Sequence, residues 1–310
     1  MTQTLQTHRL NVGFNTTKIL FENLNLTLPA GELVCFMGPN GIGKSTLIRT
    51  LAGLQEPLSG EIAGRDEKNL AVVLTDRIAA AHMTVKELIT YGRYPYLEWN
   101  ISLREEDLQI IQQSIDVVHI HHLTDKKLYE LSDGQMQLVM IARALTQETP
   151  VLLLDEPTAH LDLNNRLEIM NLLRKLARTA GKAILVATHE LDLALQTADL
   201  IWLTTSNKSI KTGIPEDLVL DGSMDEAFQF KGFDLKTGKV EHESYRKIKI
   251  KLEGEGSIYL WTKNALERFG FEIDNKSLIE VIARNNQWTF RDQSFVKIET
   301  LLGTLSKVEN

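Results

Sequence analysis

A glycine-rich loop followed by a lysine and two hydroxyl residues is the first candidate for chemistry in this sequence. Residues 38–46 match the phosphate-binding pattern G-x-x-x-x-G-K-[ST]. The pattern lies between an apolar run at 33–37, which predicts a buried strand, and helical spacing at 45–51. Backbone N–H groups and a helix dipole then converge on one point, so a nucleoside triphosphate site is expected. Its candidate residues are Gly38, Pro39, Asn40, Gly41, Gly43, Lys44, Ser45 and Thr46.

Lys44 is placed to contact the β- and γ-phosphates, and the Ser45 hydroxyl to ligate Mg²⁺. Two neighbouring acids complete this predicted chemistry. Residues 151–154 are apolar, which is typical of a buried parallel strand, and Asp155 and Glu156 follow at its carboxyl end. We expect Asp155 to hold Mg²⁺ through water, and Glu156 to orient or deprotonate the attacking water. His189 follows a similar apolar run and is expected to reach the γ-phosphate region.

Two further segments contain candidate nucleotide contacts. Residues 131–135, Leu-Ser-Asp-Gly-Gln, open a helix predicted to run to about residue 145. Ser132 is a favourable N-cap, and Asp133 in the first turn suits the helix dipole. Near the N-terminus, Phe14 is a candidate for stacking on adenine, and the alternative is a core aromatic.

The remaining pattern predicts the elements that position these residues. Strand-like alternation at 10–14 and 24–28, separated by a turn at 15–17, predicts a small antiparallel layer. Residues 69–75 predict another strand. Helical apolar spacing over 76–130 predicts a helical subdomain inserted between the nucleotide-binding elements. Its segment 91–96, Tyr-Gly-Arg-Tyr-Pro-Tyr, is either an exposed partner surface or a packed loop.

Composition narrows the function classes. The chain has 310 residues, enough for a large domain and a small one, and a net charge of −7, which argues against a general nucleic-acid binder. No apolar run approaches the length of a membrane span, and the polar N-terminus makes secretion an unfavoured interpretation. The single cysteine, Cys35, lies in the apolar run before the loop and is expected to be a buried, inert thiol. These features favour a cytoplasmic protein.

The ordered set of segments 38–46, 131–135 and 151–162 with His189 resembles the ATP-binding cassette subunits of ABC transporters. The resemblance covers residues 10 to about 238. It implies an α/β P-loop NTPase core, with a mixed sheet, an antiparallel β layer and an inserted helical subdomain. It also implies a head-to-tail homodimer with two ATP molecules at its interface, where hydrolysis opens the dimer and drives transport.

The resemblance assigns roles across this implied dimer. Ser132, Gly134 and Gln135 would lie at the γ-phosphate held by the other protomer. The segment 159–162, which ends at Asp162, would cross between protomers, and Phe14 would stack on adenine.

Two positions depart from the family pattern. Asp133 stands where the family most often has glycine, which adds negative charge near phosphates. Asp76 stands where a glutamine usually ends the strand and contacts both Mg²⁺ and water. We expect Asp76 to act in catalysis and as a Mg²⁺ ligand, although its side chain is shorter and charged.

Residues 83–85, 87–88 and 92–95 look like those of importers of iron–siderophore complexes, haem or cobalamin. This likeness implies separate membrane permease subunits, which dock around residues 76–96, an external substrate-binding protein, and a peripheral location at the cytoplasmic face of the inner membrane. The alternative is a soluble ABC ATPase that acts as a nucleotide-gated switch without a membrane partner. Measured ATP turnover and membrane association separate these two interpretations.

The C-terminal segment has a different pattern. Residues 247–252 alternate Lys with apolar residues and predict a half-buried strand, and 257–260 predict a second strand. A helix at 262–269 ended by Gly270, a hairpin from 278–283 and 288–291, and a last helix at 295–305 follow. We therefore expect an ATP-binding domain at 1–245, with its helical subdomain at about 77–148, and a small α/β accessory domain at 246–310. The accessory domain would either stabilise the dimer or sense a ligand.

Overall fold

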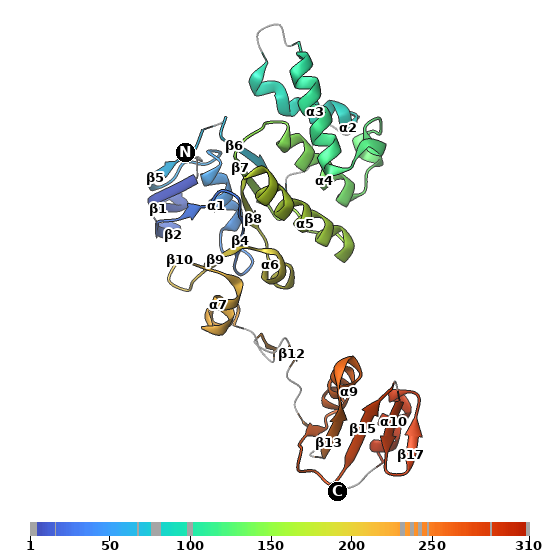
Figure 1. Ribbon diagram of the computed structural model, residues 1–310. Coiled ribbons are helices and arrows are strands. Elements are labelled where there is room, and N and C mark those ends of the chain that lie inside the picture. The colour runs from blue at the N-terminus through green and yellow to red at the C-terminus, as the bar shows by residue number, and fades with distance from the viewer. Residues whose placement is uncertain are drawn as a thin grey trace. The chain divides into compact units, whose positions relative to one another are not determined.

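A six-stranded sheet lies at the centre of the N-terminal part of the chain (Figure 1). Its order is β10-β9-β4-β8-β7-β6, and only β10 runs antiparallel to its neighbour. Every residue of β4, β7 and β8 is buried, as expected for apolar parallel strands covered on both faces. The strand bounds are β4 Leu33–Met37, β6 Leu70–Val73, β7 Val151–Asp155, β8 Ala183–Ala187, β9 Leu200–Thr204 and β10 Ile210–Gly213.

The computed structural model describes residues 5–15, 17–66, 68–75, 82–97, 102–229, 233–235, 239–240, 244–246, 248–285 and 287–307. The chain divides into two units, Met1–Gln229 and Phe230–Asn310. Within the described ranges, no helix is both long and apolar enough to cross a membrane.

Helices cover the two faces of the central sheet. On one side, α1 (Lys44–Leu51) contacts β7 and β8 and shares a core with the antiparallel layer. On the other side, α5 (Leu163–Ala180) and α6 (Leu191–Thr197) pack against β4 and against each other (Figure 1). Two short helices, α7 (Pro215–Leu220) and α8 (Ser223–Phe228), follow β10. Cys35 is buried in β4 as expected, and burial raises the pKa of its thiol to about 12.

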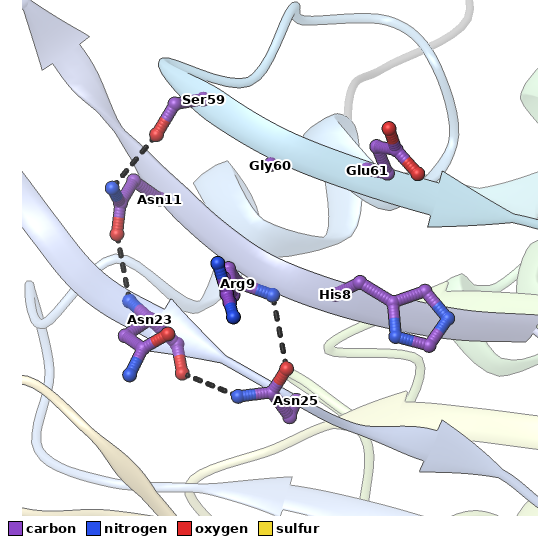
Figure 2. A pocket seen from close by; sticks show the side chains of 8 residues that line it. All are labelled: His8, Arg9, Asn11, Asn23, Asn25, Ser59, Gly60 and Glu61. Carbon is purple, nitrogen blue, oxygen red and sulfur yellow. Dashed lines mark hydrogen bonds between the residues drawn. The ribbon is translucent and has the colours of Figure 1, made fainter.

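The antiparallel layer is built on β1 (Leu5–Asn15). Three strands pair with it, which are β2 (Lys18–Leu24), β3 (Thr27–Leu28) and β5 (Ser59–Ala63). The predicted layer is confirmed, although the predicted strand at 24–28 is split between β2 and β3. Residue 16 of the predicted turn at 15–17 lies outside the described residues. Register shifts interrupt β1, and Figure 2 shows the asparagines that bridge them. The Asn11 side chain accepts from Asn23 N at 2.7 Å, and that of Asn25 from Arg9 N at 3.0 Å. These bonds replace missing ladder bonds, so the polar pocket of about 630 Å³ at this place has a structural explanation.

The helical subdomain forms between β6 and β7. It contains α2 (Val85–Thr90), the 3₁₀ turn η1 (Tyr91–Tyr96), α3 (Glu105–Val118), the turns η2 (His121–Leu123) and η3 (Leu128–Glu130), and α4 (Asp133–Leu145). Helix α4 packs against α2 and α3 and also contacts β6, so it joins the subdomain to the central sheet.

Arg93 is a buried charge that holds this subdomain together. Its Nε lies 2.8 Å from Asp107 Oδ1 on α3, and its Nη1 donates to Thr146 O at 2.8 Å and to Glu148 Oε2 at 2.9 Å. The turn η1, α3 and the end of α4 are thereby fixed to one guanidinium. Tyr91 and Tyr94, the neighbours of Arg93 in the same turn, are 43% and 45% exposed, and their rings pack edge to face against each other. Segment 91–96 is therefore packed at its arginine and exposed at two of its tyrosines, and its contact with a partner stays a prediction.

The second unit is a small α/β fold. Its sheet has the order β14-β13-β15-β16-β17, and helices α9 and α10 pack against it. The described elements are β11 Phe233–Asp234, β12 Lys239–Val240, β13 Lys249–Gly254, α9 Gly256–Arg268, β14 Glu272–Ile273, β15 Glu280–Arg284, β16 Gln287–Phe290, β17 Gln293–Phe295 and α10 Ile298–Leu305. The predicted hairpin is confirmed as β15 and β16, and the alternation is confirmed by buried Ile250 and Leu252.

One predicted strand in this unit is wrong. Residues 257–260 form the first turn of α9, where Ile258 and Tyr259 pack on the domain core and Ile258 O accepts from Thr262 Oγ1 at 2.6 Å. Tertiary packing overrides the local β-propensity of these residues. The short edge strand β17 was not predicted.

We expect Arg93→Met to lower the free energy of unfolding of the chain by about 3–5 kcal/mol, because it leaves the buried Asp107 carboxylate without its partner. Urea denaturation measures the change. Lys208→Met is the control, since it breaks the exposed Lys208–Glu22 pair and should cost less than about 1 kcal/mol. Equal effects of the two substitutions would contradict the assigned role of Arg93.

Candidate functional site: a nucleoside triphosphate pocket

The phosphate-binding loop connects β4 to α1, as predicted. Gly43 immediately precedes α1 with φ 112°, and Gly41 has φ 79°, backbone conformations that favour glycine. Gly38 has a different requirement, since a Cβ there would lie 2.1 Å from Thr204 Oγ1 at the end of β9. The loop therefore depends on glycine for two reasons, which are backbone conformation and close packing.

Lys44 lies within the loop that it serves. Its Nζ donates to Gly38 O at 2.9 Å and to Pro39 O at 3.3 Å, and the residue is 6% exposed. Burial lowers the pKa of Lys44, and the charges of Glu156 and Asp155 oppose that shift. A buried ammonium that is solvated by loop carbonyls is pre-positioned for a phosphate oxygen.

Asp155 ends β7 beside the start of α1. Its carboxylate is hydrogen-bonded to the Ser45 hydroxyl, while its Oδ1 is buried with no hydrogen-bond partner. Burial raises the pKa of the Asp155 carboxyl, and Ser45 and the charges of Arg49 and Lys44 act against that shift. A buried acceptor without a donor suits a cation, so Asp155 and Ser45 fit Mg²⁺. The described residues contain no cluster of three or more His, Cys, Asp or Glu side chains that could hold a metal ion.

Glu156 and His189 form a pair at the carboxyl ends of neighbouring strands. His189 Nδ1 lies 3.2 Å from Glu156 Oε2, and Glu156 N donates to Ala187 O at 2.9 Å. Glu156 has φ 48°, which is uncommon for a residue other than glycine. Its side chain remains partly exposed, so the carboxylate is accessible from the site. The structure thus brings Lys44, Ser45, Asp155, Glu156 and His189 together at one sheet edge.

Helix α4 begins where the sequence predicts. Ser132 is its N-cap, its hydroxyl accepts from Gln135 N at 3.3 Å, and the Gln135 side chain accepts from Ser132 N at 3.2 Å. Gly134 lies against α5, because a Cβ there would meet Asn165 at 3.2 Å. Asp133 is exposed at the first helical position, where its carboxylate is favourable to the dipole.

A cavity of about 920 Å³ separates the start of α4 from the phosphate-binding loop of the same chain. Asp133 lines it on the helical side, and Ser45 and Glu156 on the other. Asp133 therefore faces the Glu156 carboxylate across this cavity, and Ser132 is hydrogen-bonded within its own helix.

Three other predicted residues complete the description. Asp162 is the N-cap of α5 and accepts from Asn165 N at 2.9 Å, directly after the segment 159–161. Phe14 is 57% exposed at the end of β1, with Lys18 Nζ 4.8 Å from its ring centre, so the core-aromatic alternative is wrong. Asp76 lies outside the described residues, which end on this side at Thr75.

A phosphate-binding loop after β4, a buried acid at the end of β7 and a Glu–His pair beside it define a P-loop NTPase. The antiparallel layer and the inserted helical subdomain define the cassette form of this class. Family comparison agrees with this class. The ABC transporter family matches residues 21–159, and the iron ABC transporter C-terminal domain matches residues 247–306. The chain belongs to the ABC transporter ATP-binding proteins, the family that the sequence resemblance predicted.

Several relatives support this membership. An uncharacterised ABC transporter ATP-binding protein of Methanocaldococcus jannaschii is 37% identical over 259 residues, which cover 77% of this chain and 89% of that protein. The petrobactin import ATP-binding protein FpuD of Bacillus anthracis is 33% identical over 74% of this chain and 88% of its own length. The iron(3+)-hydroxamate import ATP-binding protein FhuC of Bacillus subtilis is 31% identical over 80% of this chain and 97% of its own length.

Solved structures share the fold. An inward-facing ABC transporter assigned to the metal-chelate type matches with a TM-score of 0.67 and 28% identity, over 73% of this chain and 89% of that chain. The ADP conformation of an ATP-binding cassette matches with a TM-score of 0.65 and 24% identity, over 74% of this chain and all of that chain. The predicted fold class is therefore confirmed.

We expect Gly38→Ala to weaken ATP binding by about tenfold or more, since forcing a methyl group into a packed contact costs about 1–3 kcal/mol. Calorimetric titration with a non-hydrolysable ATP analogue measures the affinity. The double variant Gly38→Ala/Thr204→Ala should recover part of it, because it removes the Thr204 hydroxyl and methyl that the new Cβ would meet at 2.1 and 2.8 Å. Unchanged affinity in the single variant would contradict the proposed packing requirement.

Proposed function

We propose that this chain is the ATP-hydrolysing subunit of an ABC importer for an iron–siderophore, haem or cobalamin type substrate. The observation that carries the proposal is the set of contacts at one sheet edge, where Ser45 meets Asp155 and His189 meets Glu156. Relatives that import petrobactin and iron(3+)-hydroxamate favour the iron–siderophore class among the three substrates. The same hydrolytic pair and relatives disfavour a switch that works without a membrane partner.

In this proposal, Ser45 and Asp155 would hold the Mg²⁺ that accompanies ATP, and Asp76 would be a further ligand. The bound ion would neutralise charge on the phosphates. Lys44 leaves the loop carbonyls of Gly38 and Pro39 for the β- and γ-phosphates. Glu156 accepts a proton from the attacking water. His189 lies 3.2 Å from the Glu156 carboxylate and orients the water toward the γ-phosphate.

Two copies of the chain would complete each ATP site. Helix α4 has 13 residues, and its N-terminus attracts anions. At this N-terminus, Ser132, Gly134 and Gln135 would contact the nucleotide held by the other protomer. The open cavity between Asp133 and Glu156 within one chain supports this arrangement, because it leaves the helix start without an intrachain phosphate partner. Asp162 and its preceding loop would lie at the dimer interface, and Phe14 would stack on adenine.

Separate permease subunits would form the path across the membrane, and an external binding protein would deliver the substrate to them. The exposed Tyr91 and Tyr94 pair offers an aromatic surface on the helical subdomain, and the buried Arg93 makes that surface rigid. Such exposed aromatic side chains are enriched at protein interfaces. The chain would then be peripheral, at the cytoplasmic face of the inner membrane.

We also propose that residues 1–245 form the ATP-binding domain, with the helical subdomain at about 77–148, and that residues 246–310 form an accessory domain. The separate hydrophobic core of the second unit and the family match at 247–306 support this division. The accessory domain would stabilise the dimer.

Glu156→Gln is the direct test of hydrolysis. We expect ATP affinity to be retained and turnover to fall by about 10²–10⁴-fold, because an amide cannot accept the proton of the attacking water. Phosphate release measures the turnover, and light scattering with ATP should detect a trapped dimer. Turnover at the normal rate in this variant would contradict the assignment of Glu156 as the base.

The transport assignment needs a separate measurement. Glu156→Gln, purified with ATP from mildly solubilised membranes, should carry a polytopic permease with it, because the ATP-bound state persists. Cells with this variant should lose uptake of ferric hydroxamate, while parallel assays with haem and cobalamin distinguish the substrate classes. A dimer that is free of membrane protein would instead favour the soluble switch.

A further inference from the structure

Glu190, the residue after His189, is a buried carboxylate that the proposed reaction does not use. Its side chain is 9% exposed, and its Oε2 has no hydrogen-bond partner. Burial raises the pKa of the Glu190 carboxyl, while Arg166, Thr158 and His189 act in the opposite direction. A buried acceptor without a donor is costly, so this carboxylate is not explained by stability alone.

Arg166 is the cation that meets Glu190. Its Nη1 lies 3.3 Å from Glu190 Oε1, and its Nε donates to Leu161 O at 2.6 Å. The same guanidinium therefore joins the residue next to His189 to the segment 159–162. Arg166 lies in the first turn of α5, where the helix dipole disfavours a positive charge. The position of Arg166 is thus electrostatically unfavourable with respect to the helix dipole, and the negative charge of the Glu190 carboxylate offsets this effect.

These contacts close a ring through the catalytic pair. Ala159 N donates to Glu156 O at 3.1 Å, which fixes the start of the segment 159–162 to Glu156. From that segment, Leu161 O connects to Arg166 and Arg166 connects to Glu190. Glu190 is bonded covalently to His189, whose Nδ1 returns to Glu156 Oε2 at 3.2 Å. A displacement of the segment 159–162 would therefore reach both ends of the Glu156–His189 contact.

We propose that Arg166 and Glu190 are positioning residues, which transmit the placement of the segment 159–162 to the Glu156–His189 pair. This inference rests on the proposed ATP hydrolysis by that pair. The Glu156–His189 contact is already formed within one chain, and a second copy of the chain that binds the segment would thus hold or shift it through Arg166 and Glu190. Neither Arg166 nor Glu190 touches the nucleotide in this proposal.

The test compares Arg166→Met and Glu190→Gln with the wild-type chain in steady-state ATP hydrolysis. Small misplacements of catalytic groups cost large rate factors, so we expect kcat to fall by about tenfold while KM for ATP stays within about twofold. Arg178→Met is the matched control, because it breaks an ion pair with Asp199 farther along the same helix and should leave kcat unchanged. A merely structural role would instead lower the melting temperature without this split between kcat and KM.

A double-variant cycle tests the coupling itself. In a His189→Ala background, Arg166→Met should have little further effect, because the group that it positions is absent. Independent, multiplicative losses would overturn the proposal, as would normal kcat in both single variants. If Glu156→Gln abolishes turnover while Arg166→Met does not change it, only this inference fails. If Glu156→Gln hydrolyses ATP normally, the proposed function fails instead.

Discussion

The placement of charge at the carboxyl edge of the central sheet is the constraint on which the rest of this structure depends. Lys44 and Asp155 are both almost fully buried, and each would be unstable there without compensation. The loop carbonyls of Gly38 and Pro39 solvate the ammonium, and the Ser45 hydroxyl supports the carboxylate. Because Asp155 Oδ1 still has no donor, the site holds an electrostatic arrangement that a phosphate with its metal ion would complete.

Backbone geometry makes this arrangement possible. The apolar strands β4, β7 and β8 run parallel and bring their carboxyl ends to one edge, so residues far apart in sequence meet there. Glu156 turns away from its strand with positive φ, and its N–H bonds to the neighbouring strand at Ala187. This strained residue directs its side chain toward His189, and such strain is common where function determines geometry.

The helical subdomain adds a second surface, whose elements are fixed to one another by one buried arginine. Arg93 connects α3, the turn η1 and the end of α4, so the exposed tyrosines are carried on a rigid support. The proposed ring through Arg166 and Glu190 is built in a similar way, because one partly exposed guanidinium connects the segment 159–162 to the residue after His189. In both places an arginine provides the link, because its planar group donates in several directions at once.

The sequence by itself determined the elements whose signals are local. The glycine spacing around Lys44, the four apolar residues before Asp155 and the Ser132 cap each encode a strand, loop or helix start within a few residues. Only the tertiary structure decided what depends on long-range packing. It made residues 257–260 helical, because Ile258 and Tyr259 pack on a core built from strands that lie before and after them in the chain. It also joined Arg166 to Glu190, a contact that no local pattern contains, since it forms only when α5 and α6 pack side by side.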